Sequence, residues 1–220
     1  MKFTKDEIQE AMLLYAVTDR MWLKEGQTLS EVCQAVLENG ATFLQLREKE
    51  LDEAAFAQEA EELKALCTKY RVPYVVNDSV EIALRSGADG VHVGQSDIRG
   101  RDIRAMIGPD KILGISAGTV EEAVAAEKAG ADYIGVGAVF ATSTKKNARN
   151  LSVEQLQAIC SSVTIPVVAI GGINGANLME LAGSGVNGIA VISAIFAAGD
   201  PGKATAELVK KAKTMVESHV

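Results

Sequence analysis

The chain has 220 residues, of which 48% are hydrophobic, and it carries a formal net charge of −7 at pH 7. This acidic balance argues against non-specific binding to DNA or RNA, which depends on an excess of Lys and Arg. No apolar run approaches the roughly eighteen residues of a membrane span, and the first residues lack the apolar core of a signal peptide. We therefore expect a cytoplasmic protein without nucleic-acid or membrane partners.

Short β-rich runs alternate with helical patterns along the whole chain. Residues 1–12 predict a first helix, and eight strands are then expected at 13–18, 43–47, 73–76, 90–93, 112–116, 133–136, 166–170 and 188–192. Three-to-four spacing between the strands predicts helices, as in the apolar stripe of Phe56, Ala60, Leu63 and Cys67. The last helix is expected over about residues 202–218.

Glycine recurs where each helix joins the next strand, at Gly40, Gly87, Gly130 and Gly185. Glycine suits the left-handed conformation that ends a helix. Eight strand–helix units with short joins predict a single (β/α)₈ TIM barrel over residues 1–220, with the first helix as an extra element. A doubly wound open sheet is the main alternative, but no Gly-x-Gly-x-x-Gly follows an early strand.

Two carboxylates follow neighbouring predicted strands. Asn77-Asp78-Ser79 comes after the third strand, and Gly94-Gln95-Ser96-Asp97 comes after the fourth. If these strands are parallel neighbours, Asp78 and Asp97 emerge side by side at the same end of the sheet. Mg²⁺ takes such oxygen ligands together with substrate phosphates. The alternative is that both residues cap helices, for which Asp is a preferred residue.

The end of the second strand combines an amide with two cations. Alternation directs Gln45, Arg47 and Lys49 to the same side of the chain. Active sites of barrels lie at the carboxyl ends of the strands, and Arg and Lys there suit a polyanion such as a diphosphate. A solvated charged loop is the alternative.

The later strands end in hydroxyls, cations and glycines. Ser116 closes the fifth strand, and the segment 141–149 after the sixth contains three hydroxyls and three cations. Gly171-Gly172 follows the seventh strand and Ile192-Ser193 the eighth. Barrels commonly bind phosphate after strands seven and eight, through exposed amides and a helix start. The sequence therefore predicts one diphosphate site with metal and one separate monophosphate site.

Several of these segments resemble the thiamine-phosphate synthase family, in unbroken order over about residues 13 to 197. They are Leu14-Tyr15-Ala16-Val17-Thr18-Asp19, Gln45-Leu46-Arg47-Glu48-Lys49, Val76-Asn77-Asp78, the run from Gly87 to Asp97, Thr142-Ser143-Thr144-Lys145, Gly171-Gly172-Ile173 and Ile192-Ser193. The resemblance implies a transferase that joins 4-amino-2-methyl-5-(diphosphooxymethyl)pyrimidine to 4-methyl-5-(2-phosphooxyethyl)thiazole. Diphosphate would leave first, and the thiazole nitrogen would attack the resulting pyrimidine cation.

The resemblance also implies a role for each matching residue. Mg²⁺ would be the cofactor, held by Asp78 and Asp97. The pyrimidine diphosphate would be bound by Gln45, Arg47, Lys49, Asn77, Ser116 and Lys145, among which Arg47, Lys49, Ser116 and Lys145 form the implied catalytic set. The thiazole phosphate would be surrounded by Thr142, Ser143, Thr144, Gly172, Ile192 and Ser193.

Two positions depart from the family pattern. The family usually has His where this chain has Gly118, and Pro where it has Ala141. A related thiazole tautomerase of the same fold is the closest alternative, but it relies on that histidine and lacks the full diphosphate and metal set. A non-catalytic phospho-ligand-binding barrel would predict loss of Asp78, Asp97 or Lys145, and all three are present. The sequence leaves open whether the protein is a monomer or a homo-oligomer.

Overall fold

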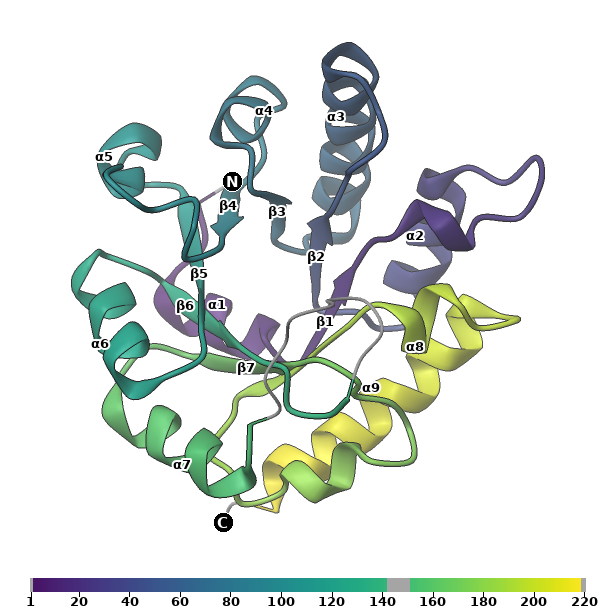
Figure 1. Cartoon of the computed structure of the whole chain (residues 1–220). Helices are drawn as coiled ribbons and strands as arrows, with labels where there is room; N and C mark the ends of the chain where they lie inside the picture. The colour runs from purple at the N-terminus through teal and green to yellow at the C-terminus, as the bar shows by residue number, and fades with distance from the viewer. Residues whose placement is uncertain (1, 142–150, 219–220) are drawn as a thin grey trace.

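Eight parallel strands form a closed barrel in chain order in the computed structural model, which describes residues 2–141 and 151–218 (Figure 1). The strands are β1 (Leu14–Val17), β2 (Phe43–Leu46), β3 (Tyr74–Asn77), β4 (Gly90–Val93), β5 (Ile112–Ala117), β6 (Tyr133–Val136), β7 (Val167–Ile170) and β8 (Gly188–Val191). Pairing of β8 with β1 closes the barrel. The predicted TIM barrel is confirmed, and each strand ends within one residue of its expected bounds.

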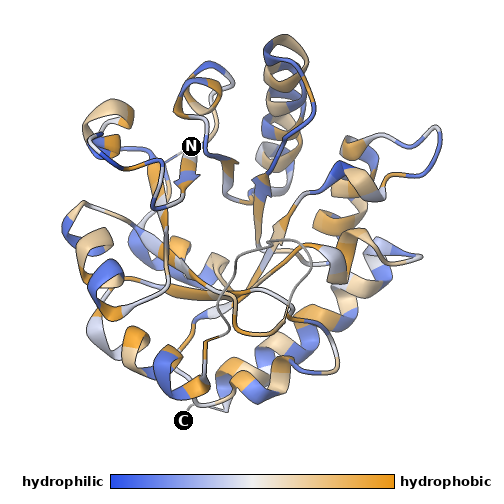
Figure 2. Ribbon diagram, in the orientation of Figure 1, coloured by the Kyte–Doolittle hydropathy of each residue, from blue (hydrophilic) through white to orange (hydrophobic). Residues whose placement is uncertain are grey.

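Helices surround the barrel. They are α2 (Leu29–Glu38), α3 (Glu53–Tyr70), α4 (Val80–Arg85), α5 (Ile103–Ile107), α6 (Val120–Lys128), α7 (Val153–Ser162), α8 (Ser193–Phe196) and α9 (Pro201–Glu217), with short 3₁₀ helices η1 (Arg20–Trp22) and η2 (Leu178–Leu181). Figure 2 shows hydrophobic colours along the strands and mixed colours on the helices. Among the described residues, no helix is both long enough and apolar enough to cross a membrane.

The outer core lies between the strands and the surrounding helices. The predicted stripe of α3 is confirmed, since Ala60, Leu63 and Cys67 are fully buried. Asp52 caps the start of this helix, since its side chain accepts a hydrogen bond from the amide of Ala55. Full burial of one Leu or Val side chain contributes about 1.5–3 kcal/mol, so this layer supplies much of the stability.

A second core fills the barrel interior. Its aromatic centre is Tyr15, Phe43 and Tyr133, with ring centroids 4.3 Å apart for Tyr15 and Phe43 and 5.5 Å apart for Phe43 and Tyr133. The predicted first helix is confirmed as α1 (Lys5–Ala11), whose Ile8 belongs to the same cluster. The hydroxyl of Thr42, just before β2, donates to the carbonyl of Ala11 over 2.8 Å. Helix α1 therefore closes the amino-terminal end of the barrel and leaves the carboxyl end for a site.

The expected glycine joins are also confirmed. Gly40, Gly87, Gly130 and Gly185 all have positive φ angles, between 68° and 102°. Each lies between a helix, or η2 in one case, and the next strand. Because this conformation is costly for a residue with a Cβ atom, glycine here sets the direction of the following strand.

Candidate active site

Asp78 lies directly after β3 in a conformation that is unusual for a residue other than glycine. Its φ angle is +63°, and its amide donates to the carbonyl of His92 on β4 over 2.8 Å. The cap of α4 is Ser79, whose side chain accepts from the amide of Ile82. Capping therefore does not account for Asp78. Residues other than glycine that adopt a left-handed backbone conformation occur most often at functional sites, where the surrounding structure enforces that conformation.

Asp97 lies in the turn after β4. Its Oδ2 atom accepts from the amide of Gly94 over 2.8 Å, whereas the cap of α5 is Asp102. The interpretation of Asp97 as a helix cap is therefore wrong as well. Its side chain closes a local turn and holds the carboxyl group at the carboxyl end of β4.

The two carboxyl groups interact. Burial against protein atoms raises the pKa of Asp78, the nearby charge of Asp97 raises it further, and the ammonium group of Lys49 opposes both effects. Two close carboxylates without a cation repel each other, so a bound cation would relieve this cost.

The donor set suits Mg²⁺, which typically uses one or two protein carboxylates and completes its shell with water and substrate phosphate. Within residues 2–141 and 151–218, no group of three or more His, Cys, Asp or Glu side chains is arranged to hold a metal ion. A metal at Asp78 and Asp97 would therefore depend on ligands from outside this pair.

The loop after β2 is held by a buried carboxylate. Glu48 Oε1 accepts from the amides of Lys49 and Glu50 over 2.6 and 2.7 Å, and Oε2 accepts from Arg20. The Glu48 side chain is only 1% exposed. Burial alone would raise its pKa, but these hydrogen bonds hold the pKa below its ordinary value. Glu48 thus stays ionised and fixes the segment that carries the two predicted cations.

Arg47 and Gln45 lie at different depths. Arg47 forms an ion pair with Asp19, at 3.3 Å between Nη1 and Oδ2, beside the carboxyl end of β1. Gln45 points into the barrel, where its amide forms hydrogen bonds with Tyr15 and Asn77. Lys49 is exposed at the mouth.

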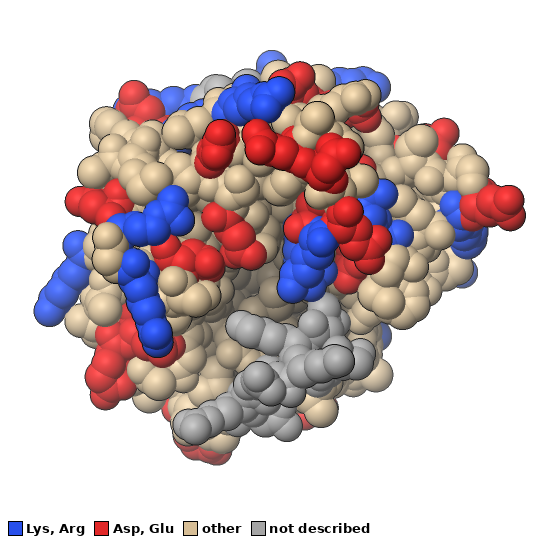
Figure 3. All heavy atoms as spheres, turned by 45° about the horizontal axis from the view of Figure 1, so that its top comes forward, with Lys and Arg blue, Asp and Glu red and all other residues tan. Residues whose placement is uncertain are grey.

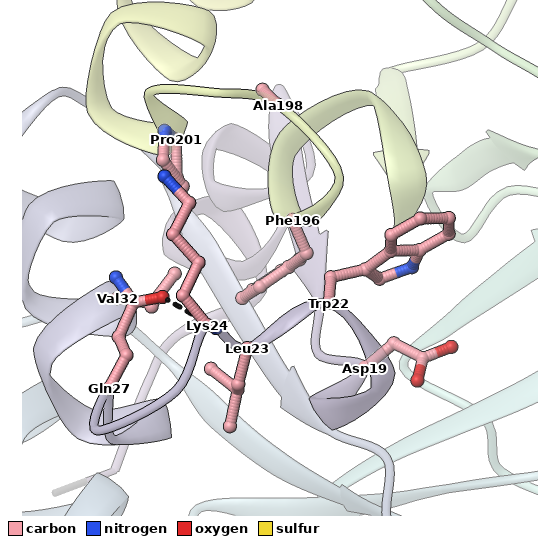
Figure 4. A pocket seen from close by; sticks show the side chains of 9 residues that line it. All are labelled: Asp19, Trp22, Leu23, Lys24, Gln27, Val32, Phe196, Ala198 and Pro201. Atoms are coloured by element: carbon pink, nitrogen blue, oxygen red, sulfur yellow. Dashed lines mark hydrogen bonds between the residues drawn. The ribbon is translucent and has the colours of Figure 1, made fainter.

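A small pocket lies beside Asp19 (Figure 4). Its walls come from the segment after β1, including Trp22 and Leu23, and from the region of α8 and α9, including Phe196 and Pro201. Residues 19–32 and 196–201, which are far apart in the sequence, thus meet next to the Asp19–Arg47 pair. This packing supports the position of Asp19, and with it that of Arg47.

Ser116 lies inside β5 and not at its end, because the strand continues to Ala117. Its Oγ atom is 3.0 Å from His92 Nε2, and its carbonyl accepts from Gln95 Nε2 over 2.6 Å. At Gly118, an added Cβ atom would meet nothing closer than a Glu122 carboxyl oxygen at 3.5 Å. The position thus has room for a side chain.

The turn after β7 requires glycine. Gly171 and Gly172 have φ angles of +105° and +66°, and a Cβ atom at Gly172 would lie 2.5 Å from the carbonyl oxygen of Ala141. Ile192 is half-buried, and Ser193 is exposed at the start of α8. The predicted residues Thr142, Ser143, Thr144 and Lys145 lie outside the described residues.

The predicted residues that are described therefore fall into two groups. One group follows β2 to β5 around Asp78, and the other follows β7 and β8. Figure 3 shows acidic and basic side chains side by side around a central hollow on one face of the molecule. A site with both signs of charge can hold a cation and a polyanion together.

A sequence model described as thiamine monophosphate synthase matches residues 14–195. The chain belongs to this family. The thiamine-phosphate synthase of Ruminiclostridium cellulolyticum is 51% identical over 187 residues, which cover 85% of this chain and 89% of that protein. That of Clostridium tetani is 47% identical over 195 residues, covering 89% and 93%.

A solved structure is also similar over nearly the whole chain. Thiamine phosphate pyrophosphorylase from Pyrococcus furiosus superposes with a TM-score of 0.87 at 40% identity, covering 95% of this chain and 99% of that one. These relatives confirm the family expected from the motifs, and they make the chain an enzyme of the transferase class.

The structural roles of several residues were not predicted from the sequence. Glu48 and Asp19 support the predicted cations, and His92, Tyr15 and Tyr133 form polar contacts inside the barrel. The signal for the last three was present, since polar groups at inward positions of apolar strands need partners. Nothing in the local sequence reveals that the Glu48 side chain folds back onto its own loop.

Proposed function

We propose that this enzyme couples 4-amino-2-methyl-5-(diphosphooxymethyl)pyrimidine with 4-methyl-5-(2-phosphooxyethyl)thiazole in an Mg²⁺-dependent reaction. The products are thiamine phosphate and diphosphate. The observation that carries the proposal is the facing pair Asp78 and Asp97, with Lys49 beside it, on a chain 51% identical to a thiamine-phosphate synthase. A cation and a diphosphate are the partners that this arrangement suits.

The reaction breaks one bond and forms another. The bond between the pyrimidine methylene carbon and the diphosphate oxygen breaks, and its electron pair leaves with the diphosphate. The ring amino group stabilises the remaining cation, and the thiazole nitrogen supplies the electron pair for the new C–N bond. No proton has to be removed, so the site requires no general base.

Stabilising the departing oxygens is the main task of the protein. Arg47, fixed by Asp19, and Lys49, on the loop anchored by Glu48, would bind the diphosphate together with Asn77 and Lys145. Mg²⁺ held by Asp78 and Asp97 would neutralise charge on the leaving group. Preorganised charges of this kind act without reorganising during the reaction.

The thiazole phosphate would bind on the other side of the mouth. Gly172, Ile192 and Ser193 lie after β7 and β8, and the proposal adds Thr142, Ser143 and Thr144 to them. Gln45 lies on β2 and Ser116 on β5, inside the barrel strands, where their amide and hydroxyl groups suit the polar edge of the aminopyrimidine.

The test is to mix the enzyme with both phosphorylated substrates and Mg²⁺ and to measure thiamine phosphate and diphosphate by chromatography. We expect equal amounts of both products, and loss of turnover when EDTA removes the metal. Isomerisation of a thiazole precursor without coupling would instead support the tautomerase. Binding of either phosphate compound without any turnover would support a non-catalytic barrel, and both outcomes would overturn the proposal.

A further inference from the structure

A continuous chain of hydrogen bonds crosses the inside of the barrel, buried at its centre and reaching the surface at Asp78. At the Asp78 end, Asn77 Nδ2 donates to Asp78 Oδ2 over 2.6 Å, and Gln45 Nε2 donates to Asn77 Oδ1 over 2.6 Å. The hydroxyl of Tyr15 then donates to Gln45 Oε1 over 2.5 Å. Asn77 lies on β3, Gln45 on β2 and Tyr15 on β1, so the chain crosses three neighbouring strands.

The same chain continues on the opposite wall. The hydroxyls of Tyr15 and Tyr133 are 2.7 Å apart, and Tyr133 lies 3.0 Å from His92 Nδ1. His92 Nε2 is 3.0 Å from Ser116 Oγ. Two predicted site residues, Asp78 and Ser116, are thus linked through the barrel interior.

Glycines make room for this chain. A Cβ atom at Gly114 would lie 2.3 Å from the Tyr133 hydroxyl and 2.5 Å from His92 Nδ1, and one at Gly135 would lie 3.1 Å from His92 Cε1. A larger residue at either of these inward positions would displace His92 and Tyr133. The barrel is therefore built around the contact between His92 and Tyr133.

The direction of every proton in the chain follows from its acceptor end. Asp78 Oδ2 accepts there, so Asn77 presents its NH₂ group to Asp78 and its oxygen to Gln45. The Tyr15 proton then goes to Gln45, and the Tyr133 proton goes to Tyr15, because each phenol has one proton to donate. Burial raises the pKa of both phenols, which keeps them neutral.

The last hydrogen bonds of the chain determine the tautomer of His92 and the orientation of the Ser116 hydroxyl. Tyr133 can then only accept at His92, so Nδ1 must carry the ring proton. In a neutral imidazole the other nitrogen accepts, and His92 Nε2 therefore receives the Ser116 hydroxyl proton.

We infer that this relay makes Tyr15, Tyr133 and His92 positioning residues, which turn the Ser116 hydroxyl so that its lone pairs face an N–H donor of the substrate. The inference rests on the proposed function in one respect, the identity of that donor, which is the amino group of the aminopyrimidine. A hydroxyl held in this way accepts from an amino group and disfavours a carbonyl at the same place.

The tautomer of His92 can be measured without any substrate. The sequence has two histidines, and a His219→Gln variant assigns the signals in a protein labelled with ¹⁵N-histidine. At a pH where the imidazole is neutral, we expect the Nδ1–H form for His92. Tyr133→Phe removes the acceptor of this proton, and Tyr15→Phe removes the acceptor of the Tyr133 proton. Both should shift the equilibrium toward the Nε2–H form.

Tyr74→Phe is the matched control. Tyr74 is fully buried like Tyr15, but it lies in the outer core, and its hydroxyl has no hydrogen-bond partner among the described residues. The Tyr74→Phe substitution should therefore leave the His92 tautomer unchanged. An Nε2–H form in the unmodified protein would overturn the inference, and this measurement needs no substitution inside the barrel.

The consequence for binding is tested by kinetics. Tyr15→Phe should raise KM for the pyrimidine diphosphate about three- to tenfold, the scale of one neutral hydrogen bond, and leave KM for the thiazole phosphate unchanged. Tyr74→Phe should change neither. Equal changes in both Michaelis constants would indicate a merely structural role and contradict the inference. If the unmodified enzyme makes no thiamine phosphate, the proposed function fails, whereas the tautomer measurement still decides the relay.

Discussion

Asp78 has two features that reduce the stability of the folded protein. Its backbone is left-handed, and burial together with the charge of Asp97 raises the pKa of its carboxyl group above the ordinary value of 3.8. A raised pKa means that the folded protein binds this proton more tightly than the unfolded chain does. The contribution of Asp78 to stability therefore falls as pH rises from about the unfolded pKa through the folded pKa, and at neutral pH it is unfavourable.

Asp78→Asn should separate stability from function. Without divalent cations at pH 7, we expect its melting temperature to equal or exceed that of the unmodified protein, because the charge repulsion is removed. Mg²⁺ with diphosphate should raise the melting temperature of the unmodified protein but not of this variant. Turnover should fall about a hundredfold or more, as for loss of a strong transition-state contact.

Asp102→Ala is the control for this prediction. It removes the cap of α5 and should lower stability by about 1 kcal/mol while leaving the response to Mg²⁺ intact. Calorimetry with and without metal measures both effects. If Asp78→Asn loses stability as Asp102→Ala does and keeps its metal response, then Asp78 is structural and the metal assignment is wrong.

At the level of elements, the loop after β2 depends on an internal carboxylate more than on its cations. Arg20 joins Glu48 and Glu59, but the two acids differ. Glu48 accepts backbone amides and has a lowered pKa, whereas burial raises the pKa of Glu59 and its Oε2 atom has no partner among the described residues. Of the two carboxylates that pair with Arg20, Glu48 therefore shapes the loop and Glu59 does not.

Glu48→Gln should lower the free energy of unfolding by roughly 1–3 kcal/mol, since it turns an amide group toward Arg20. It should also raise KM for the pyrimidine diphosphate, because Lys49 and Arg47 lose their fixed positions. Glu59→Gln should be neutral or slightly stabilising and keep its KM. Urea titrations and steady-state kinetics measure these quantities, and equal effects of the two substitutions would show that Glu48 has no special role in the loop.

The elements themselves could be predicted because their signals are local. Strands such as β4 are short apolar runs bounded by glycine, and the α3 stripe repeats at helical spacing. The carboxylate pair could also be predicted, since strand order determines that β3 and β4 are neighbours. The Tyr15–Tyr133 contact could not, because it joins positions 118 residues apart and depends on how far each side chain reaches across the barrel.

At the scale of the whole molecule, stability and chemistry lie at opposite ends of the barrel. The predicted site residues lie toward the carboxyl ends of the strands, and α1 closes the amino-terminal end with Ile8 and Ala11. Helix α1 also precedes the range 14–195 that the family model matches. We therefore expect α1 to act as a plug that protects the interior aromatic cluster and takes no part in the reaction.

Ile8→Ala tests this division. Ile8 is 4% exposed, and truncation of a buried Ile usually costs 2–5 kcal/mol, with a value near the lower end expected for a residue at the edge of the core. Below the melting transition, kcat and both Michaelis constants should stay unchanged, because the interior hydrogen bonds lie between α1 and the mouth and remain paired. Gln9→Ala, on the exposed side of the same helix, should change stability by less than about 0.5 kcal/mol. A fall in kcat for Ile8→Ala at a temperature where the protein is fully folded would show that packing at the base of the barrel affects the site.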